Sequence, residues 1–64
     1  MAEERMLRWF KYAHLPEQLQ LVSEPFCSLA EHIAATIPPS AERTVALRKL
    51  LEAKDAAVRA SLPE

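Results

Sequence analysis

Apolar residues recur at every third or fourth position through the middle of the chain. Six of them form one regular series: Leu19, Val22, Phe26, Leu29, Ile33 and Ile37. This spacing is typical of one face of an α-helix, so we predict a helix over residues 16–37. Pro25 lies inside this segment and has no backbone N–H to donate, which predicts a kink or a break around residues 21–24. Ser23 would then serve as the N-cap of a restarted helix.

A second long helix is predicted over residues 40–62. Ser40 follows two prolines and suits the N-cap position, and Glu42 is favourably placed in the first turn. The apolar residues of this segment form two adjacent stripes on the helix surface. One stripe contains Leu47, Leu51, Val58 and Leu62, and the other contains Ala46, Leu50, Ala53, Ala57 and Ala60. Two stripes give this helix more apolar surface than a single neighbouring helix can cover.

The two long segments are joined by a short link that contains Pro38 and Pro39. A link this short places the two helices side by side as an antiparallel hairpin. Residues 1–15 precede the hairpin and carry a short helix over residues 3–10, which ends before Pro16 because a proline disfavours helical geometry in the residue ahead of it. We therefore predict an all-α fold with a single helical hairpin domain over residues 1–64, preceded by a short N-terminal helix.

The composition agrees with a helical chain and excludes several classes of protein. The chain contains no glycine and no asparagine, so the tight turns of β-hairpins are disfavoured. A single cysteine excludes a disulfide framework. The formal net charge of −1 disfavours broad binding of DNA or of an anionic membrane. No apolar run approaches the ~18 residues of a membrane span and the N-terminus is acidic, so we expect a cytoplasmic protein.

The small size of the chain also limits its chemistry. A chain of 64 residues buries only about 60% of its surface when it folds alone, which leaves no room for a deep catalytic pocket. The sequence shows no arrangement of nucleophile and base, so we expect no enzyme and no catalytic residues. Cys27 and His32 are five residues apart, a poor spacing for shared coordination, and we expect neither a metal nor a cofactor. Chains of this size usually need stabilisation beyond that of their own core, so we expect a homo-oligomer.

The first candidate binding residues lie in the N-terminal segment. Trp9, Phe10 and Tyr12 alternate there with basic residues. Rings that stack on a nucleobase, beside cations that pair with phosphate, suit a nucleotide ligand. We expect Trp9 and Phe10 to dock the short helix on the hairpin. Tyr12, which lies beyond that helix, and the neighbouring Lys11 are the candidate ligand contacts.

Two cations in the second long helix are further candidates. Lys54 interrupts an apolar stripe, so its amine either extends to solvent, pairs with Glu24 or Glu31 across the hairpin, or binds an anionic ligand. Arg59 lies four residues after Asp55, and it either pairs with that carboxylate or contributes charge to a binding site.

The start of the same helix offers another possible phosphate site. Arg43 and Thr44 lie in its first turn, where backbone N–H groups are free to bind an anion. The alternative for both residues is an ordinary solvated helix start.

Four short motifs, taken in their order and spacing, are similar to those of a known family. They are Phe10-x-Tyr12 with a following Pro-Glu-Gln turn, Leu29-Ala30-x-x-Ile33, Pro39-Ser40-x-Glu42-Arg43, and Ala46-Leu47-x-Lys49-Leu50-Leu51-Glu52-Ala53. Over residues 10–62 the chain resembles the phage anti-CBASS cyclic-nucleotide sponges, whose helical hairpin domain is shared with the anti-Thoeris sponges.

The resemblance implies a phage protein that binds cyclic di- or trinucleotides made by bacterial immune enzymes. It implies that the protein sequesters them in the host cytoplasm without cleaving them, as a homohexamer with ligand pockets between protomers. In this family the tyrosine at the position of Tyr12 packs against the nucleobases. A basic residue that contacts phosphate in the family falls near Ser23, so we expect Ser23 to donate to a phosphate oxygen. Positive charge would then come from Lys54, Arg59 or Arg43.

Two other functions remain open from the residues themselves. One is a small adaptor that docks its apolar face on a host or phage protein. The other is a nucleic-acid-binding regulator that uses residues 5–14, which the near-neutral charge disfavours. The expected partners are therefore a cyclic di- or trinucleotide and further copies of the chain, with no membrane and no DNA.

Overall fold

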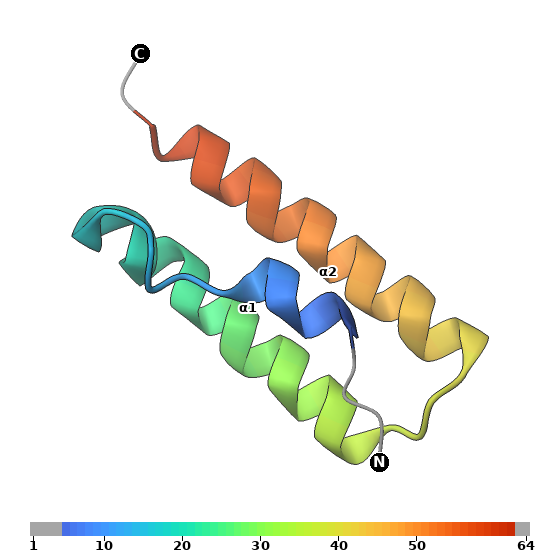
Figure 1. Ribbon diagram of the computed structural model, residues 1–64. Coiled ribbons are helices and arrows are strands. Elements are labelled where there is room, and N and C mark those ends of the chain that lie inside the picture. Colours follow the sequence, from blue (N-terminus) through green and yellow to red (C-terminus); the bar gives the residue numbers. More distant parts are fainter. Residues whose placement is uncertain (1–4, 63–64) are drawn as a thin grey trace.

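The computed structural model describes residues 5–62, and this part of the chain is all-α (Figure 1). A short 3-10 helix, η1 (Arg5–Phe10), precedes two long helices, α1 (Glu17–Thr36) and α2 (Ala41–Ala60). The two long helices form an antiparallel hairpin, and η1 lies along it in contact with both. The predicted N-terminal helix and hairpin are confirmed, although residues 3 and 4 of the predicted short helix lie outside the described residues. No described helix is both long and apolar enough to cross a membrane.

Local sequence signals set the turn between α1 and α2. α1 ends at Thr36 because Ile37 precedes a proline and adopts an extended conformation, with φ −114° and ψ 125°. Ser40 is also extended, and its Oγ accepts a hydrogen bond from the backbone N–H of Arg43 at 3.0 Å. The predicted N-cap of the second long helix is therefore confirmed.

α1 runs through Pro25 without a break. The predicted restart at Ser23 is wrong, because Ser23 lies inside the helix and its side chain is buried. Pro25 cannot donate to the carbonyl of Leu21, but both residues are exposed, so water can hydrogen-bond to that carbonyl instead. Packing of α1 against η1 and α2 therefore outweighs the local effect of the proline.

The core is small and lies where η1 packs on the hairpin. Phe10 of η1, Ala30 of α1 and Leu47 of α2 are completely buried. Half-buried side chains surround these three: Met6, Leu7, Phe26, Cys27, Ile33, Leu50 and Leu51. All three elements contribute to one core, so η1 is an integral part of the fold.

Several large apolar side chains remain exposed. Leu29 and Ile37 belong to the predicted buried face of α1, yet they are 47% and 43% exposed. The buried face of α1 includes Ser23 and Ala30 instead, because small side chains allow close approach of the neighbouring elements. In α2, the exposed residues include three members of the second stripe, Ala46, Ala53 and Ala60. The chain therefore presents apolar surface on both long helices.

Candidate functional site

A short loop at residues 11–16, here called the Tyr12 loop, connects η1 to α1. The fully buried Phe10 fixes the start of this loop in the core. Within the loop, the N–H of Leu15 donates to the carbonyl of Tyr12 at 3.0 Å, which closes a turn. Lys11 is exposed and Tyr12 is half-buried. The two adjacent candidates predicted from the sequence therefore lie where this loop begins, and Tyr12 is the first residue of the turn.

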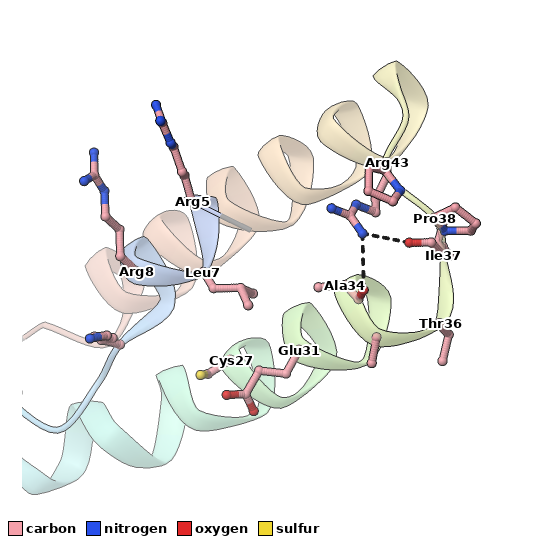
Figure 2. Close-up of a pocket in the computed structure, with 13 residues that line it drawn as sticks. Arg5, Leu7, Arg8, Cys27, Glu31, Ala34, Thr36, Ile37, Pro38 and Arg43 are labelled. Atoms are coloured by element: carbon pink, nitrogen blue, oxygen red, sulfur yellow. Dashed lines mark hydrogen bonds between the residues drawn. The ribbon is translucent and has the colours of Figure 1, made fainter. Parts of the chain in front are cut away.

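A groove of about 990 Å³ begins next to this loop and runs between η1 and the C-terminal half of α1 (Figure 2). Of the described residues that line it, four are basic (Arg5, Arg8, Lys11 and Arg43) and one, Glu31, is acidic. We call it the basic groove. Half of the eight basic residues of the chain lie along it, although the whole chain has a net charge of −1. Such a local excess of positive charge favours an anionic ligand.

The cations occupy different positions along the basic groove. Figure 2 shows Arg5 and Arg8 extending from η1 away from α1, so they form the rim of the groove. The guanidinium carbon of Arg8 lies 4.9 Å from the centroid of the Trp9 ring, a cation–π contact. Trp9 is 54% exposed, so the expectation that it docks η1 on the hairpin is wrong. Phe10 has that role, together with the half-buried Met6 and Leu7. Sequence reasoning did not identify Arg5 and Arg8 as groove residues, although their place beside the aromatic residues was a usable signal.

Arg43 closes the far end of the basic groove and holds the end of α1. Its side chain is almost completely buried, and Nη1 donates to the carbonyls of Ile37 at 2.8 Å and Ala34 at 3.2 Å. A cation is favourable here because the C-terminus of a helix carries a partial negative charge. The expected solvated helix start is therefore wrong for Arg43. Thr44 is exposed, and its hydroxyl donates to the carbonyl of Ser40 at 3.2 Å.

Lys54 does not make the ion pair predicted across the hairpin. Its Nζ lies 3.0 Å from Oδ1 of Asp55, and the predicted pairing with Glu24 or Glu31 is wrong. The Lys54 side chain is only 13% exposed, because its aliphatic part packs in the hairpin while the amine pairs with the adjacent carboxylate. Arg59 is exposed near the end of α2.

Ser23 occupies a position that a ligand cannot reach in the single chain. The residue is completely buried, and its Oγ has no hydrogen-bond partner. An unpaired buried hydroxyl carries a desolvation penalty of about 1 to 3 kcal/mol. The expected hydrogen bond from Ser23 to a phosphate needs an accessible hydroxyl. In the described chain this hydroxyl lies in the interior of the fold.

The seven predicted ligand contacts fall into separate groups. Lys11 and Arg43 both line the basic groove, and Tyr12 and Thr44 are their neighbours in sequence. Lys54 and Arg59 lie on the C-terminal half of α2, and neither lines this groove. The described chain is elongated, with extents of 39 × 19 × 15 Å. Within the described residues, Lys54 and Arg59 therefore do not contribute to the lining of the groove.

The cysteine at the side of the basic groove has an altered acidity. Burial raises the pKa of the Cys27 thiol above its ordinary value of 9.0, and the nearby carboxylates of Glu31 and Glu24 raise it further. The thiol therefore stays protonated near neutral pH, when it is a poor metal ligand and nucleophile. Among residues 5–62, no three His, Cys, Asp or Glu side chains come close enough together to hold a metal ion.

No protein-family model, no curated protein and no solved structure matches the chain.

Proposed function

We propose that the protein is a non-enzymatic sponge for cyclic di- or trinucleotides, which inhibits CBASS-type signalling in the bacterial cytoplasm by sequestering the messenger. The basic groove beside the Tyr12 loop is the observation that carries this proposal. Its volume of about 990 Å³ lies at the upper end of the range for ligand pockets, roughly 300 to 1,000 Å³. The sequence motifs at residues 10–62 that resemble the phage sponges support the same assignment.

The proposed mechanism uses one aromatic ring and several cations. The Tyr12 ring stacks on a nucleobase, a contact that every base can make because each has a π-face. Lys11 and the arginines at the rim pair with the phosphates, and charged hydrogen bonds of this kind are about twice as strong as neutral ones. No step cleaves the ligand. Inhibition follows from mass action, so the protein must be present in amounts comparable with the messenger.

The proposal includes a homo-oligomer, in the family a hexamer, whose protomers share the ligand sites. A compact monomer of 7.2 kDa exposes about 4,100 Å², whereas this chain exposes 4900 Å². The large exposed apolar side chains of the described residues are spread along the chain: Trp9, Leu21, Leu29, Ile37, Val45 and Leu62. Each Å² of apolar surface removed from water stabilises an assembly by about 25 cal/mol. Association would also allow Lys54 and Arg59 of one chain to approach the groove of another.

Calorimetric titration tests the proposal directly. Purified protein is titrated with cyclic di-AMP, cyclic GMP–AMP and cyclic tri-AMP, and saturable heat is expected with at least one of them. Tyr12→Ala is expected to weaken binding by about 5- to 150-fold, since a base–aromatic stack contributes about 1 to 3 kcal/mol. Tyr12→Phe keeps the ring, and His14→Ala changes an exposed residue of the same loop, so both should bind like the wild type. No heat with any of the three nucleotides would exclude the sponge.

The same titration separates a sponge from an enzyme. The nucleotide is recovered from the complex by heat denaturation and analysed by mass spectrometry. Recovery of the intact ligand at the stoichiometry of binding is the expected result. Linear or hydrolysed products would show turnover and would contradict sequestration.

A protein-interaction adaptor is the second candidate function. The exposed Trp9, at 54%, and Leu21, at 73%, favour it, because large exposed apolar side chains often mark protein interfaces. An adaptor predicts a monomer or dimer in isolation that binds none of the nucleotides. A compact hexamer with nucleotide bound would exclude the adaptor.

A further inference from the structure

The side chain of Gln20 connects the first turn of α1 to the Tyr12 loop. Gln20 is the fourth residue of α1, and its amide turns back past the start of the helix. Nε2 donates to the carbonyl of Leu15 at 2.8 Å and to the carbonyl of Ala13 at 3.4 Å. The amide nitrogen thus lies within hydrogen-bond distance of two carbonyls of the loop that carries Tyr12.

The backbone N–H groups of Leu19 and Gln20 donate to the carbonyl of Pro16, but few other hydrogen bonds hold residues 11–15. Pro16 is the N-cap residue of α1 and makes no side-chain capping hydrogen bond. The backbone N–H of Leu15 donates to the carbonyl of Tyr12, which closes the turn from within. Of the side chains in residues 5–62, Gln20 alone donates a hydrogen bond to the loop. The carbonyls that it binds lie one and three residues after Tyr12, so the contact fixes the segment that follows the ring.

We propose that Gln20 is a positioning residue, which holds the Tyr12 loop in the conformation that receives the ligand before the ligand arrives. The consequence for binding rests on the proposed function. A loop that samples many conformations lowers the apparent affinity in proportion to the fraction of chains that are competent to bind. Ordering the loop in advance removes that loss. The role needs a hydrogen-bond donor with the reach of glutamine, and the position of Gln20 in the first turn of α1 brings such a donor to the loop.

The first part of the test measures the loop without any ligand. Gln20→Met keeps the length of the side chain and removes both donors, and Gln18→Met makes the same change at an exposed site in the same turn. Backbone order parameters are measured by ¹⁵N relaxation at Ala13, His14 and Leu15. We expect order parameters of about 0.85 in the wild type and in Gln18→Met, and order parameters below about 0.6 in Gln20→Met. Unchanged order parameters in Gln20→Met would overturn the inference.

The second part measures affinity by calorimetry with cyclic di-AMP and cyclic tri-AMP. Gln20→Met is expected to bind about tenfold more weakly, which corresponds to about 1.4 kcal/mol for the lost hydrogen bonds, while Gln18→Met is unchanged. Gln20→Lys restores a donor of similar reach and should restore the order parameters, and Gln18→Lys controls for the added charge. Should Gln20→Met fail to fold, Gln20→Glu repeats the test, because an ionised carboxylate has the same shape and no donor.

The outcomes of the two parts are distinguishable. A loosened loop with unchanged affinity would overturn the positioning role. Absence of binding by the wild-type protein would overturn the proposed function, and the relaxation measurement would still decide whether Gln20 holds the loop.

Discussion

At the scale of single residues, Arg43 links the beginning of α2 to the end of α1. Its guanidinium satisfies the carbonyls of Ala34 and Ile37, which have no helical donor because α1 stops there. The sequence placed Arg43 in the first turn of a helix but gave no sign of these acceptors, because they belong to the other helix. They become neighbours only after the hairpin has closed. A contact of this kind depends on tertiary structure and is not readable from a local pattern.

Replacing Arg43 should therefore destabilise the hairpin. We expect Arg43→Met to lower the free energy of unfolding by about 2 to 3 kcal/mol, because hydrogen bonds from a charged donor contribute about 1.5 to 3 kcal/mol. Urea denaturation followed by circular dichroism measures the change. Arg48→Met, at an exposed position of the same helix, should stay within about 0.5 kcal/mol of the wild type. Equal stability of the two variants would contradict a structural role for Arg43.

The acidity of Cys27 gives a second prediction at this scale. Burial and the carboxylates of Glu31 and Glu24 raise its pKa above 9.0, so alkylation by iodoacetamide should reach half its limiting rate above pH 9.0 in the folded chain. The folded chain then binds more protons than the unfolded chain, and its stability should fall as the pH rises from 9.0 through the folded pKa. Glu31→Gln should lower the pH at which alkylation reaches half its limiting rate, but not to the value of the unfolded chain, because the thiol stays buried. If the folded chain reached half its limiting alkylation rate at the same pH as the urea-unfolded chain, or at a lower pH, the raised pKa of Cys27 would be contradicted.

At the scale of elements, proline and serine marked the turn of the hairpin correctly. Ile37 is extended because it precedes Pro38, and Ser40 caps α2 through its own hydroxyl, so both effects act over a few residues. The continuity of α1 through Pro25 and the burial of Ser23 were not predictable in the same way. They depend on how η1 and α2 pack against α1, and the apolar spacing alone favoured a different face.

The unbroken α1 leads to a prediction for Pro25. Its ring is exposed, so Pro25→Ala should restore a helical hydrogen bond to the carbonyl of Leu21 without disturbing the core. We expect the free energy of unfolding to rise by about 1 to 2 kcal/mol, part of the cost of about 3 kcal/mol for proline inside a helix. Thermal denaturation measures this, with Ser28→Ala as the control at another exposed position of α1. Lower stability of Pro25→Ala would show that the ring has a structural role.

At the scale of the whole molecule, the candidate contacts do not all line one groove of the described chain. Lys11 and Arg43 line the basic groove, whereas Lys54 and Arg59 lie on the C-terminal half of α2. Sequence reasoning identified the two apolar stripes of α2, and the structure leaves Ala46, Ala53 and Ala60 of the second stripe exposed. The way in which the alanine stripe of one chain would contact another chain depends on how the chains pack together. A local sequence pattern does not contain that information.

Assembly through α2 predicts that a bulky charge on the alanine stripe separates the chains. Ala53 lies in the middle of that stripe, where a small side chain lets two helix backbones approach closely. In analytical ultracentrifugation at micromolar concentration, the wild type should sediment as a hexamer of the 7.2 kDa chain and Ala53→Arg as a smaller species. Arg48→Ala lies about 140° around the helix from Ala53 and should leave the hexamer intact. A folded wild-type monomer would mean that Lys54 and Arg59 never reach the basic groove of another chain, and the shared binding site would have to be abandoned.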